Sequence, residues 1–570
     1  MKKSHLRLLS LLLAAALLIS CVPLRASALS FLEWLFSIGE ENVSGTSAED
    51  PELVRFSDMA YTRPDLDEMQ SLLDEAASRA AKKNASAILN AVYAFYDAYD
   101  WFYTNSALAD IHYSADLNDD YWAEENEFCT ASASQVEQML TELNVALAAS
   151  PCRSKLEKLF FGEGFFNSYD VDGDWTPDEQ LMDLLNREAE LISQYYTQSA
   201  KTNSLFGSIF PPYKAMAQTL VDLIQVRNAL AAYLGYDSYE AYANDYLYAR
   251  DYTPEQVAAY LEEVREHLTP LYLEAEFGTS DYRDYDESDT LEYVRKAAQA
   301  MGGTVLEAFE LMEAAELYDI AKSSSKYNSS FELYLPSYQV PFIFMNPDGS
   351  AFDQLTFAHE FGHFCNDYAL GGSYVGVDVS EIFSQAMEYL SLCYVPADES
   401  LVAAKMVDSL CTYVEQACYA RFEQEMYRIE ETELSVQALA DLYADTAAAY
   451  GLADYGYFDS MDFVTITHFY TNPMYVSSYV FSNDAAMQIY QLELENAGAG
   501  LECYLSNLTN TEGYFLVFLD SAGLESPFID GRVEEAAQLF RQILGIDGTS
   551  SGSGAPVFGQ IIAQEADAAA

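Results

Sequence analysis

Basic residues are scarce in this sequence. Its 570 residues include 28 Lys and Arg against 90 Asp and Glu, which gives a formal net charge of −62 at pH 7. Proteins that bind nucleic acid use clusters of Lys and Arg to neutralise phosphates, so this balance excludes nucleic-acid binding. Two interpretations of the acidity stay open: a solvated surface that keeps the chain soluble, or a negative field that steers positively charged ligands to it.

Long apolar runs are also rare. Beyond the N-terminus no segment of 18 or more apolar residues occurs, and a helix needs about 20 to span a bilayer. At the N-terminus, three basic residues precede an apolar run over residues 8–20, which is too short to span and has the order of an export signal. The sequence therefore predicts an exported protein whose body does not cross the membrane.

Two ends of this signal are compatible with the sequence. Residues 18–21 resemble a bacterial lipobox, in which Cys21 would be lipidated and become the mature N-terminus. Residues 26–28 instead fit a small-residue cleavage site, and cleavage after Ala28 would release an extracellular protein with a net charge of −66. We favour the cell-surface lipoprotein of a bacterium, because the lipobox directly follows the apolar run.

Cysteine pairs with metal-binding spacing are absent. No Cys-x-x-Cys occurs among the eight cysteines, so the sequence predicts no cysteine-based structural zinc site. We expect Cys129 and Cys152 as a candidate disulfide, and buried free thiols for most of the others. The sequence also lacks internal repeats and a glycine-rich phosphate loop.

Histidine is scarce too, but two of the six lie four apart in the stretch 358–364, AHEFGHF. On a helix, His359 and His363 share one face, so their imidazoles converge on a single ion. Chance would give about 0.01 such motifs in this composition. Zinc binds neutral imidazole and lowers the pKa of its water to roughly 7. Glu360 lies close enough to take a proton from that water, which is the chemistry of peptide-bond hydrolysis. The alternative is a core helix with two hydrogen-bonded histidines.

A zinc hydrolase also needs a third protein ligand. A glycine-containing loop follows the motif, and residues 378–390 predict a second helix that Asp378 or Ser380 would cap. Glu381 and Glu388 are seven apart and share a face of this helix. We predict Glu381 as the third ligand and Glu388 as the residue that orients a ligating imidazole. Alternatively, Glu381 is a first-turn carboxylate stabilised by the helix dipole.

The motif and the acidic helix after it resemble the thimet oligopeptidase and oligoendopeptidase F family of zinc metallopeptidases. The likeness runs from about residue 204 to 544 and more faintly back to 51. Residues 341–346 are similar to the family's strand before the metal helix. The resemblance implies a mainly α fold, with two helical lobes around a deep substrate channel and a small β hairpin next to the zinc site.

Residues 468–479 are similar to the family's His-and-Tyr segment. The resemblance implies that His468, with Tyr475 or Tyr479, stabilises the oxyanion of the transition state. Oligoendopeptidase F-like members often carry a tyrosine where Ser477 stands here, so the choice between the two tyrosines stays open.

Helical periodicity predominates elsewhere. Gly235 is expected to end one helix, and Thr253 with Gln256 to form a capping box at the start of another. An acidic turn is expected at 170–174 rather than a calcium loop, because Trp175 stands where an EF-hand needs glycine. We expect helices at residues 64–99, 134–149, 177–202 and 211–234.

One segment has the period of strands instead. Residues 331–346 predict a hairpin around Pro336 and Ser337. Its second strand, 341–346, is expected at the edge, where its backbone would bind an extended substrate. We divide the chain into a signal peptide (1–28), a linker (29–50), an N-terminal helical region (51–203), a catalytic region (204–545) and a flexible Gly/Ser/Ala-rich tail (546–570).

The sequence thus predicts an exported zinc metalloendopeptidase that binds one Zn²⁺ per chain and cuts oligopeptides. One alternative is a zinc aminopeptidase, but the Gly-x-Met-Glu-Asn segment that seats a free amine in such enzymes is absent. The other is a catalytically dead, peptide-binding surface lipoprotein. The intact Glu360 argues against it, since binding a metal does not need that residue.

Overall fold

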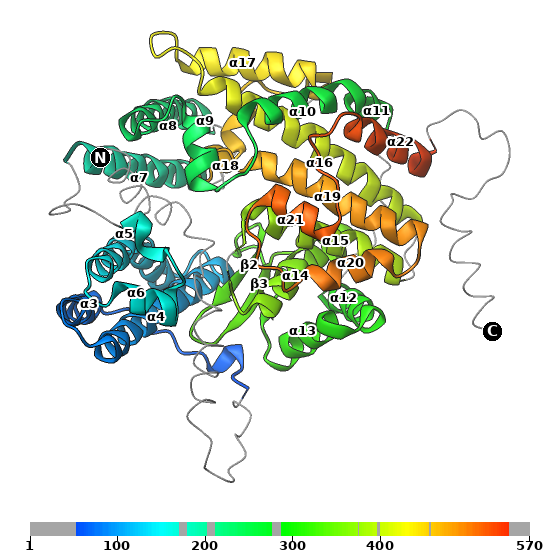
Figure 1. Ribbon diagram of the computed structural model, residues 1–570. Helices are drawn as coiled ribbons and strands as arrows, with labels where there is room; N and C mark the ends of the chain where they lie inside the picture. Colours follow the sequence, from blue (N-terminus) through cyan, green and yellow to red (C-terminus); the bar gives the residue numbers. More distant parts are fainter. Residues whose placement is uncertain are drawn as a thin grey trace.

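The computed structural model (Figure 1) describes residues 53–169, 179–201, 211–275, 287–373, 375–395, 399–454 and 458–545. The predicted signal, lipobox, linker, acidic turn at 170–174 and C-terminal tail lie outside these residues. Among the described helices, none is both long and apolar enough to cross a membrane.

The N-terminal helices form a separate core. Leu73, Val92, Phe95, Val136 and Leu143 are at its centre and almost fully buried. These helices, blue and cyan in Figure 1, lie together on one side of the molecule. They are α3 (Leu66–Ala80), α4 (Ala85–Ala115), α5 (Asp120–Ala148) and the short α6 (Arg153–Leu156).

Two predictions for this part need correction. The expected helix over 64–99 is divided, because the side chain of Asn84 accepts a hydrogen bond from the Ala87 N–H and starts a new helix there. The candidate disulfide is also wrong. Cys129 is a free, buried thiol 3.9 Å from the Tyr61 hydroxyl, and the Cys152 thiol lies 3.7 Å from the Lys82 carbonyl oxygen.

The remaining helices share the larger core. Before the sheet come α7 (Glu179–Ala200), α8 (Tyr213–Leu234), α9 (Tyr239–Tyr242), the π-helix η5 (Ala243–Leu247), α10 (Pro254–His267), α11 (Thr269–Glu274), α12 (Glu287–Met301) and α13 (Gly303–Ala314). After it come α14 (Phe352–Leu370), α15 (Val377–Tyr394), α16 (Glu399–Met426), α17 (Val436–Ala449), α18 (His468–Thr471), α19 (Val476–Glu495), α20 (Ala499–Asn507), α21 (Phe515–Ala522) and α22 (Arg532–Leu544). Gly235 ends α8 in the left-handed conformation, and Thr253 with Gln256 forms the capping box of α10, both as predicted.

A three-stranded sheet lies beside α14. Strands β2 (Ser330–Leu335) and β3 (Val340–Met345) form the predicted antiparallel hairpin. The expectation that the second strand is the edge is wrong, because the two-residue β1 (Tyr318–Asp319) pairs parallel with its other side. Strand β3 is therefore central, and β2 is the strand of the hairpin that lies at an edge of the sheet.

Helices α14 and α15 approach each other closely at the middle of the motif. A Cβ on Gly362 would lie 2.5 Å from the Phe383 carbonyl oxygen and 2.6 Å from the Ser384 Cα, both on α15. These are backbone atoms, which cannot rotate away as a side chain can, so only glycine fits at this position. The close packing brings the histidines of α14 over the first turns of α15.

Candidate metal centre and active site

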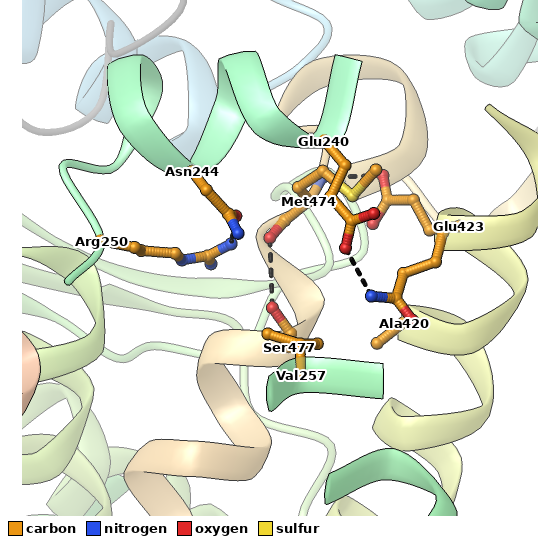
Figure 2. Close-up of a pocket in the computed structure, with 9 residues that line it drawn as sticks. Glu240, Asn244, Arg250, Val257, Ala420, Glu423, Met474 and Ser477 are labelled. Carbon is orange, nitrogen blue, oxygen red and sulfur yellow. Dashed lines mark hydrogen bonds between the residues drawn. The ribbon is translucent and has the colours of Figure 1, made fainter. Parts of the chain in front are cut away.

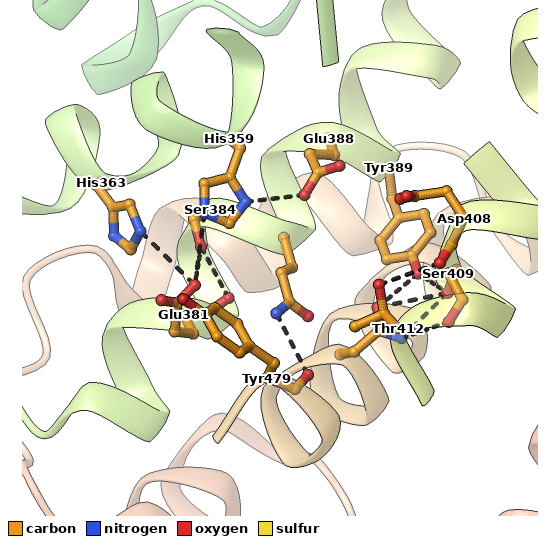
Figure 3. A network of polar contacts seen from close by, with 12 residues as sticks. His359, His363, Glu381, Ser384, Glu388, Tyr389, Asp408, Ser409, Thr412 and Tyr479 are labelled. Atoms are coloured by element: carbon orange, nitrogen blue, oxygen red, sulfur yellow. Dashed lines mark hydrogen bonds and ion pairs between the residues drawn. The ribbon is translucent and has the colours of Figure 1, made fainter. Parts of the chain in front are cut away.

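The three predicted ligands meet between α14 and α15 (Figure 3). Possible ligand atoms of His359, His363 and Glu381 all lie within 4.8 Å of one another. Glu381 Oε2 is 3.5 Å from His359 Nε2 and 3.7 Å from His363 Nε2. In a tetrahedral site with bonds of about 2.0–2.1 Å, ligand atoms are roughly 3.3–3.4 Å apart. The donor set and its spacing therefore fit one zinc ion.

Hydrogen bonds at the far side of each ring fix both imidazoles. His359 Nδ1 lies 2.9 Å from Glu388 Oε1, and His363 Nδ1 lies 3.1 Å from Ser380 Oγ. Ligating histidines are commonly oriented through the nitrogen that does not bind the metal. Glu388 thus occupies the orienting position that the helical spacing predicted, and it is itself paired with Lys405 Nζ at 2.6 Å.

The predicted cap of the second metal helix is wrong. Helix α15 begins at Val377 after Gly376, and no side chain caps it. Asp378 Oδ2 instead accepts a hydrogen bond from the Tyr252 hydroxyl at 2.8 Å, and the Ser380 hydroxyl faces His363. Both residues lie inside the helix and not at its cap position, and their side chains have partners on other elements, 126 residues away for Asp378 and 17 for Ser380.

Glu381 is buried, with 4% of its surface exposed. Its carboxylate contacts the hydroxyls of Ser384 at 2.9 Å and Tyr475 at 2.8 Å, and no Lys or Arg among the described residues pairs with it. A buried carboxylate without a cation is costly. A position facing two imidazoles therefore fits a metal ligand better than a carboxylate that only stabilises a helix end.

Glu360 lies beside this cluster, on the side of the sheet. It is also buried, and burial raises the pKa of its carboxyl to about 7, an effect that the neighbouring His359 and the Ser330 hydroxyl reduce. A general base is most effective when its pKa lies near the working pH. Burial and environment thus give Glu360 the properties that the predicted proton transfer needs.

The two imidazoles differ in their affinity for protons. Burial lowers the pKa of His363 to about 4. Burial also opposes protonation of His359, but the carboxylates of Glu388 and Glu381 outweigh it and raise the pKa of this histidine to about 9. A metal must therefore displace a proton chiefly from His359.

The structure also brings His468, Tyr475 and Tyr479 together beside the cluster. Their ring centroids are 5.3–5.7 Å apart. The Tyr475 hydroxyl donates to Glu381 Oε1 at 2.8 Å, whereas the Tyr479 hydroxyl lies 3.3 Å from His468 Nε2. Burial lowers the pKa of His468, an effect that the charge of Glu381 reduces, and thus favours the neutral ring. Both tyrosines are thus close to the ligands, and the choice between them stays open.

Sequence reasoning missed an acidic pair next to Glu360. Burial raises the pKa of Glu332 on β2 well above its ordinary value and that of Asp367 on α14 to about 7, and the charges of Asp367 and Glu360 add to the effect on Glu332. Glu332 Oε1 has no hydrogen-bond partner in the described part of the chain. The signal in the sequence was the alternation of Ser330, Glu332 and Tyr334 along one face of the strand.

Comparisons with known proteins bear on the fold and on the resemblance to a family. A model of the peptidase M3 N-terminal domain matches residues 56–174. A candidate oligoendopeptidase F structure is 21% identical, with 86% of this chain and 99% of that chain covered and a TM-score of 0.74. PZ peptidase A, solved with an inhibitor, is 20% identical, with 87% and 100% covered and a TM-score of 0.73.

A third structure, a candidate oligoendopeptidase F from Bacillus anthracis str. Ames, is 19% identical, with 87% and 99% covered and a TM-score of 0.72. None of the curated proteins matches this chain. At these identities the likeness to solved structures shows the fold, and the domain model shows a likeness to the M3 family over residues 56–174. The predicted resemblance, the mainly α fold and the prediction of a metallopeptidase are confirmed.

Proposed function

We propose that this metallopeptidase of the M3 type is an exported, zinc-dependent oligopeptidase that cuts internal bonds of short peptides. The observation that carries the proposal is the cluster of His359, His363 and Glu381, with Glu360 on one side and two tyrosines and a histidine on the other. Such a set provides a metal, a base and hydrogen-bond donors around one reacting bond.

Two imidazoles and one carboxylate would hold the metal and leave its fourth position open. Zinc at this position supplies a Lewis acid, which polarises a carbonyl and acidifies water. Glu388 and Ser380 keep the two Nε2 atoms turned toward Glu381, and the buried Lys405 in turn holds Glu388.

Glu360 acts as the general base in this proposal. Its carboxylate takes the proton of the attacking water and passes it to the leaving amine. A pKa near 7 suits both steps, because the group must accept and then release the same proton at neutral pH.

His468 and the tyrosines would stabilise the charge that develops on the scissile carbonyl oxygen. Hydroxyl and imidazole donors held in a buried site are effective because they need no reorganisation when the charge appears. In the structure the Tyr475 hydroxyl is engaged by Glu381 and the Tyr479 hydroxyl by His468. The Tyr475 hydroxyl would have to turn from Glu381 to the oxyanion, whereas the Tyr479 hydroxyl can accept from His468 Nε2 and keep its own hydrogen for the oxyanion.

Export and membrane anchoring are supported by the N-terminal sequence. Mass spectrometry of the protein recovered from cells tests this part of the proposal. A lipid-modified Cys21 at the N-terminus would support anchoring, and an N-terminus at Leu29 would support release. A chain that retains Met1 and stays in the cytoplasm would contradict export.

The central experiment compares the parent protein with Glu360→Gln. We expect about one zinc per chain in both proteins by elemental analysis, cleavage of a mixed peptide library by the parent, and collapse of turnover in the variant. Glutamine keeps the shape of the side chain but cannot accept the proton. If the variant kept most of the parent's turnover, Glu360 would not be the general base.

N-acetylated peptides separate the remaining alternatives. An endopeptidase cuts them as well as their free counterparts, whereas an aminopeptidase does not. A parent protein that binds zinc and peptides but cuts none of the library would be the dead binding protein instead.

A further inference from the structure

The three candidate donors belong to one irregular stretch, residues 468–479, which we name the donor segment. It contains the four-residue α18, a turn and the first residues of α19. Met474 in the turn has a φ of 65°, a conformation that is unfavourable for a residue with a Cβ. A single helical turn is not stable alone. The placement of His468 relative to Tyr479 therefore depends on groups outside the segment.

Arg227 on α8 holds the first half of the donor segment. Its Nη1 donates to the Phe469 carbonyl oxygen at 2.7 Å, and its Nη2 donates to the Tyr470 carbonyl oxygen. The guanidinium thus satisfies two carbonyls of α18 that have no partner within so short a helix. Arg227 is fully buried, and Glu188 on α7 balances its charge with Oε1 2.7 Å from Nε.

Glu423 on α16 holds the turn (Figure 2). Its Oε1 accepts a hydrogen bond from the Met474 N–H at 2.8 Å. Glu423, Met474 and Ser477 line a small cavity of about 10 Å³, and all three side chains are buried. The Tyr248 hydroxyl adds a bond to the Pro473 carbonyl oxygen at 2.7 Å.

We propose that Arg227 and Glu423 are positioning residues that fix the donor segment, so that His468 and the tyrosines face the Glu381 cluster. Neither residue reaches the reacting atoms. Both act through the backbone on either side of the turn, one through carbonyls and the other through an N–H. The inference rests on the proposed function of the donors, since it assigns the groups that aim them.

Glu423 offers a matched pair of variants. Glu423→Gln keeps an acceptor of the same size for the Met474 N–H, and burial already raises the pKa of Glu423 to about 8, so the neutral amide resembles its protonated form. Glu423→Met fills similar space without an acceptor. We expect kcat to fall about 10- to 100-fold in Glu423→Met, since a displacement of about 1 Å can cost 10²-fold. We expect KM and zinc content to stay within about twofold in both variants, because the donors act only in the transition state.

Arg227→Lys tests the other anchor, since lysine keeps the charge but cannot bond two carbonyls as a guanidinium does. Arg532→Met is the control. Arg532 is a buried arginine paired with Asp484 at 3.0 Å, and its hydrogen bonds and ion pairs within the described residues go to Asp484 and Glu535, outside the donor segment. If Arg227→Lys fails to fold, the two Glu423 variants decide the matter alone.

Hydrogen exchange of residues 468–479, followed by mass spectrometry, gives a readout that does not depend on activity. We expect faster exchange there in Arg227→Lys and Glu423→Met than in the parent, Glu423→Gln and Arg532→Met. The proposal is overturned if exchange in the segment is no faster than in the Arg532 control, or if the Gln and Met variants lose the same kcat. Failure of the proposed function is distinguishable, because the parent itself would then cut no peptide.

Discussion

Glu381 and Glu388 lie on one face of α15 and both approach His359, but they touch opposite edges of its ring. Glu381 faces Nε2 and Glu388 contacts Nδ1. In the proposed site, loss of Glu381 would remove a metal ligand, whereas loss of Glu388 would remove the group that orients a ligand.

Elemental analysis after dialysis checks this difference. We expect Glu381→Ala to lose its zinc, whereas Glu388→Ala keeps a site with about 10- to 100-fold weaker affinity, the usual cost of removing an orienting partner. Zinc at full occupancy in Glu381→Ala would transfer the ligand role to another carboxylate, with Glu388 and Asp378 the first to test.

A second prediction at this scale concerns the three donors. His468→Ala and Tyr475→Phe should each keep zinc and fold while kcat falls about 10²–10³-fold, the usual effect of losing one oxyanion donor. KM should change little. Tyr479→Phe replaces Tyr475→Phe as the affected variant if the second tyrosine is the donor.

Tyr470→Phe is the matched control for these measurements, because its hydroxyl lies in the same segment but bonds the Met216 carbonyl oxygen instead of the ligand cluster. Peptide hydrolysis within a few-fold of the parent in all three donor variants would mean that the segment is only part of the core.

At the scale of the elements, the contact between α14 and α15 positions the proposed metal site. Gly362→Ala places a methyl group 2.5–2.6 Å from backbone atoms of α15. We expect destabilisation of about 1–3 kcal/mol from this overpacking, despite the helix propensity that alanine gains. Thermal unfolding should show a lowered midpoint and metal titration a weaker site, since Glu381 moves with α15. A variant as stable as the parent would contradict the close approach.

How well elements could be predicted depends on the range of the interactions that form them. The hairpin, the stop at Gly235 and the capping box of Thr253 are encoded by neighbours in the sequence, and each was predicted. Strand β1 was missed because a two-residue strand is too short to show the alternation of apolar and polar residues that identifies strands. The cap at Asp378 was predicted wrongly because its partner Tyr252 is 126 residues away in the sequence.

The same distinction applies to the candidate site. His359, Glu360 and His363 follow from helical spacing, and Glu381 with Glu388 from the next helix. Ser380, Lys405 and Glu332 were not assigned to the site, because each reaches it through tertiary packing and not through a spacing that sequence alone reveals.

At the scale of the whole molecule, two hydrophobic cores indicate two bodies that pack side by side, one of the N-terminal helices and one around the metal site. The family resemblance implies a substrate channel between helical lobes, and such a channel leads to a prediction about size. A native folded protein should resist digestion, while the peptides from a prior digest of the same protein should be cut readily. Mass spectrometry of both mixtures checks it, and degradation of the folded protein at a rate equal to that of its peptides would rule out such a channel.

The two halves of the active site are encoded at different distances along the chain. The proposed metal ligands lie within residues 359–381, on two consecutive helices that pack directly together. The donor segment instead depends on Arg227, which is more than 240 residues away from the carbonyls that it binds. Local contacts form early and survive partial damage, whereas distant ones need the completed chain. A preparation can therefore be fully loaded with metal and still contain little working enzyme, so zinc content is a poor measure of the active fraction, and titration with an inhibitor that requires the oxyanion donors is the appropriate one.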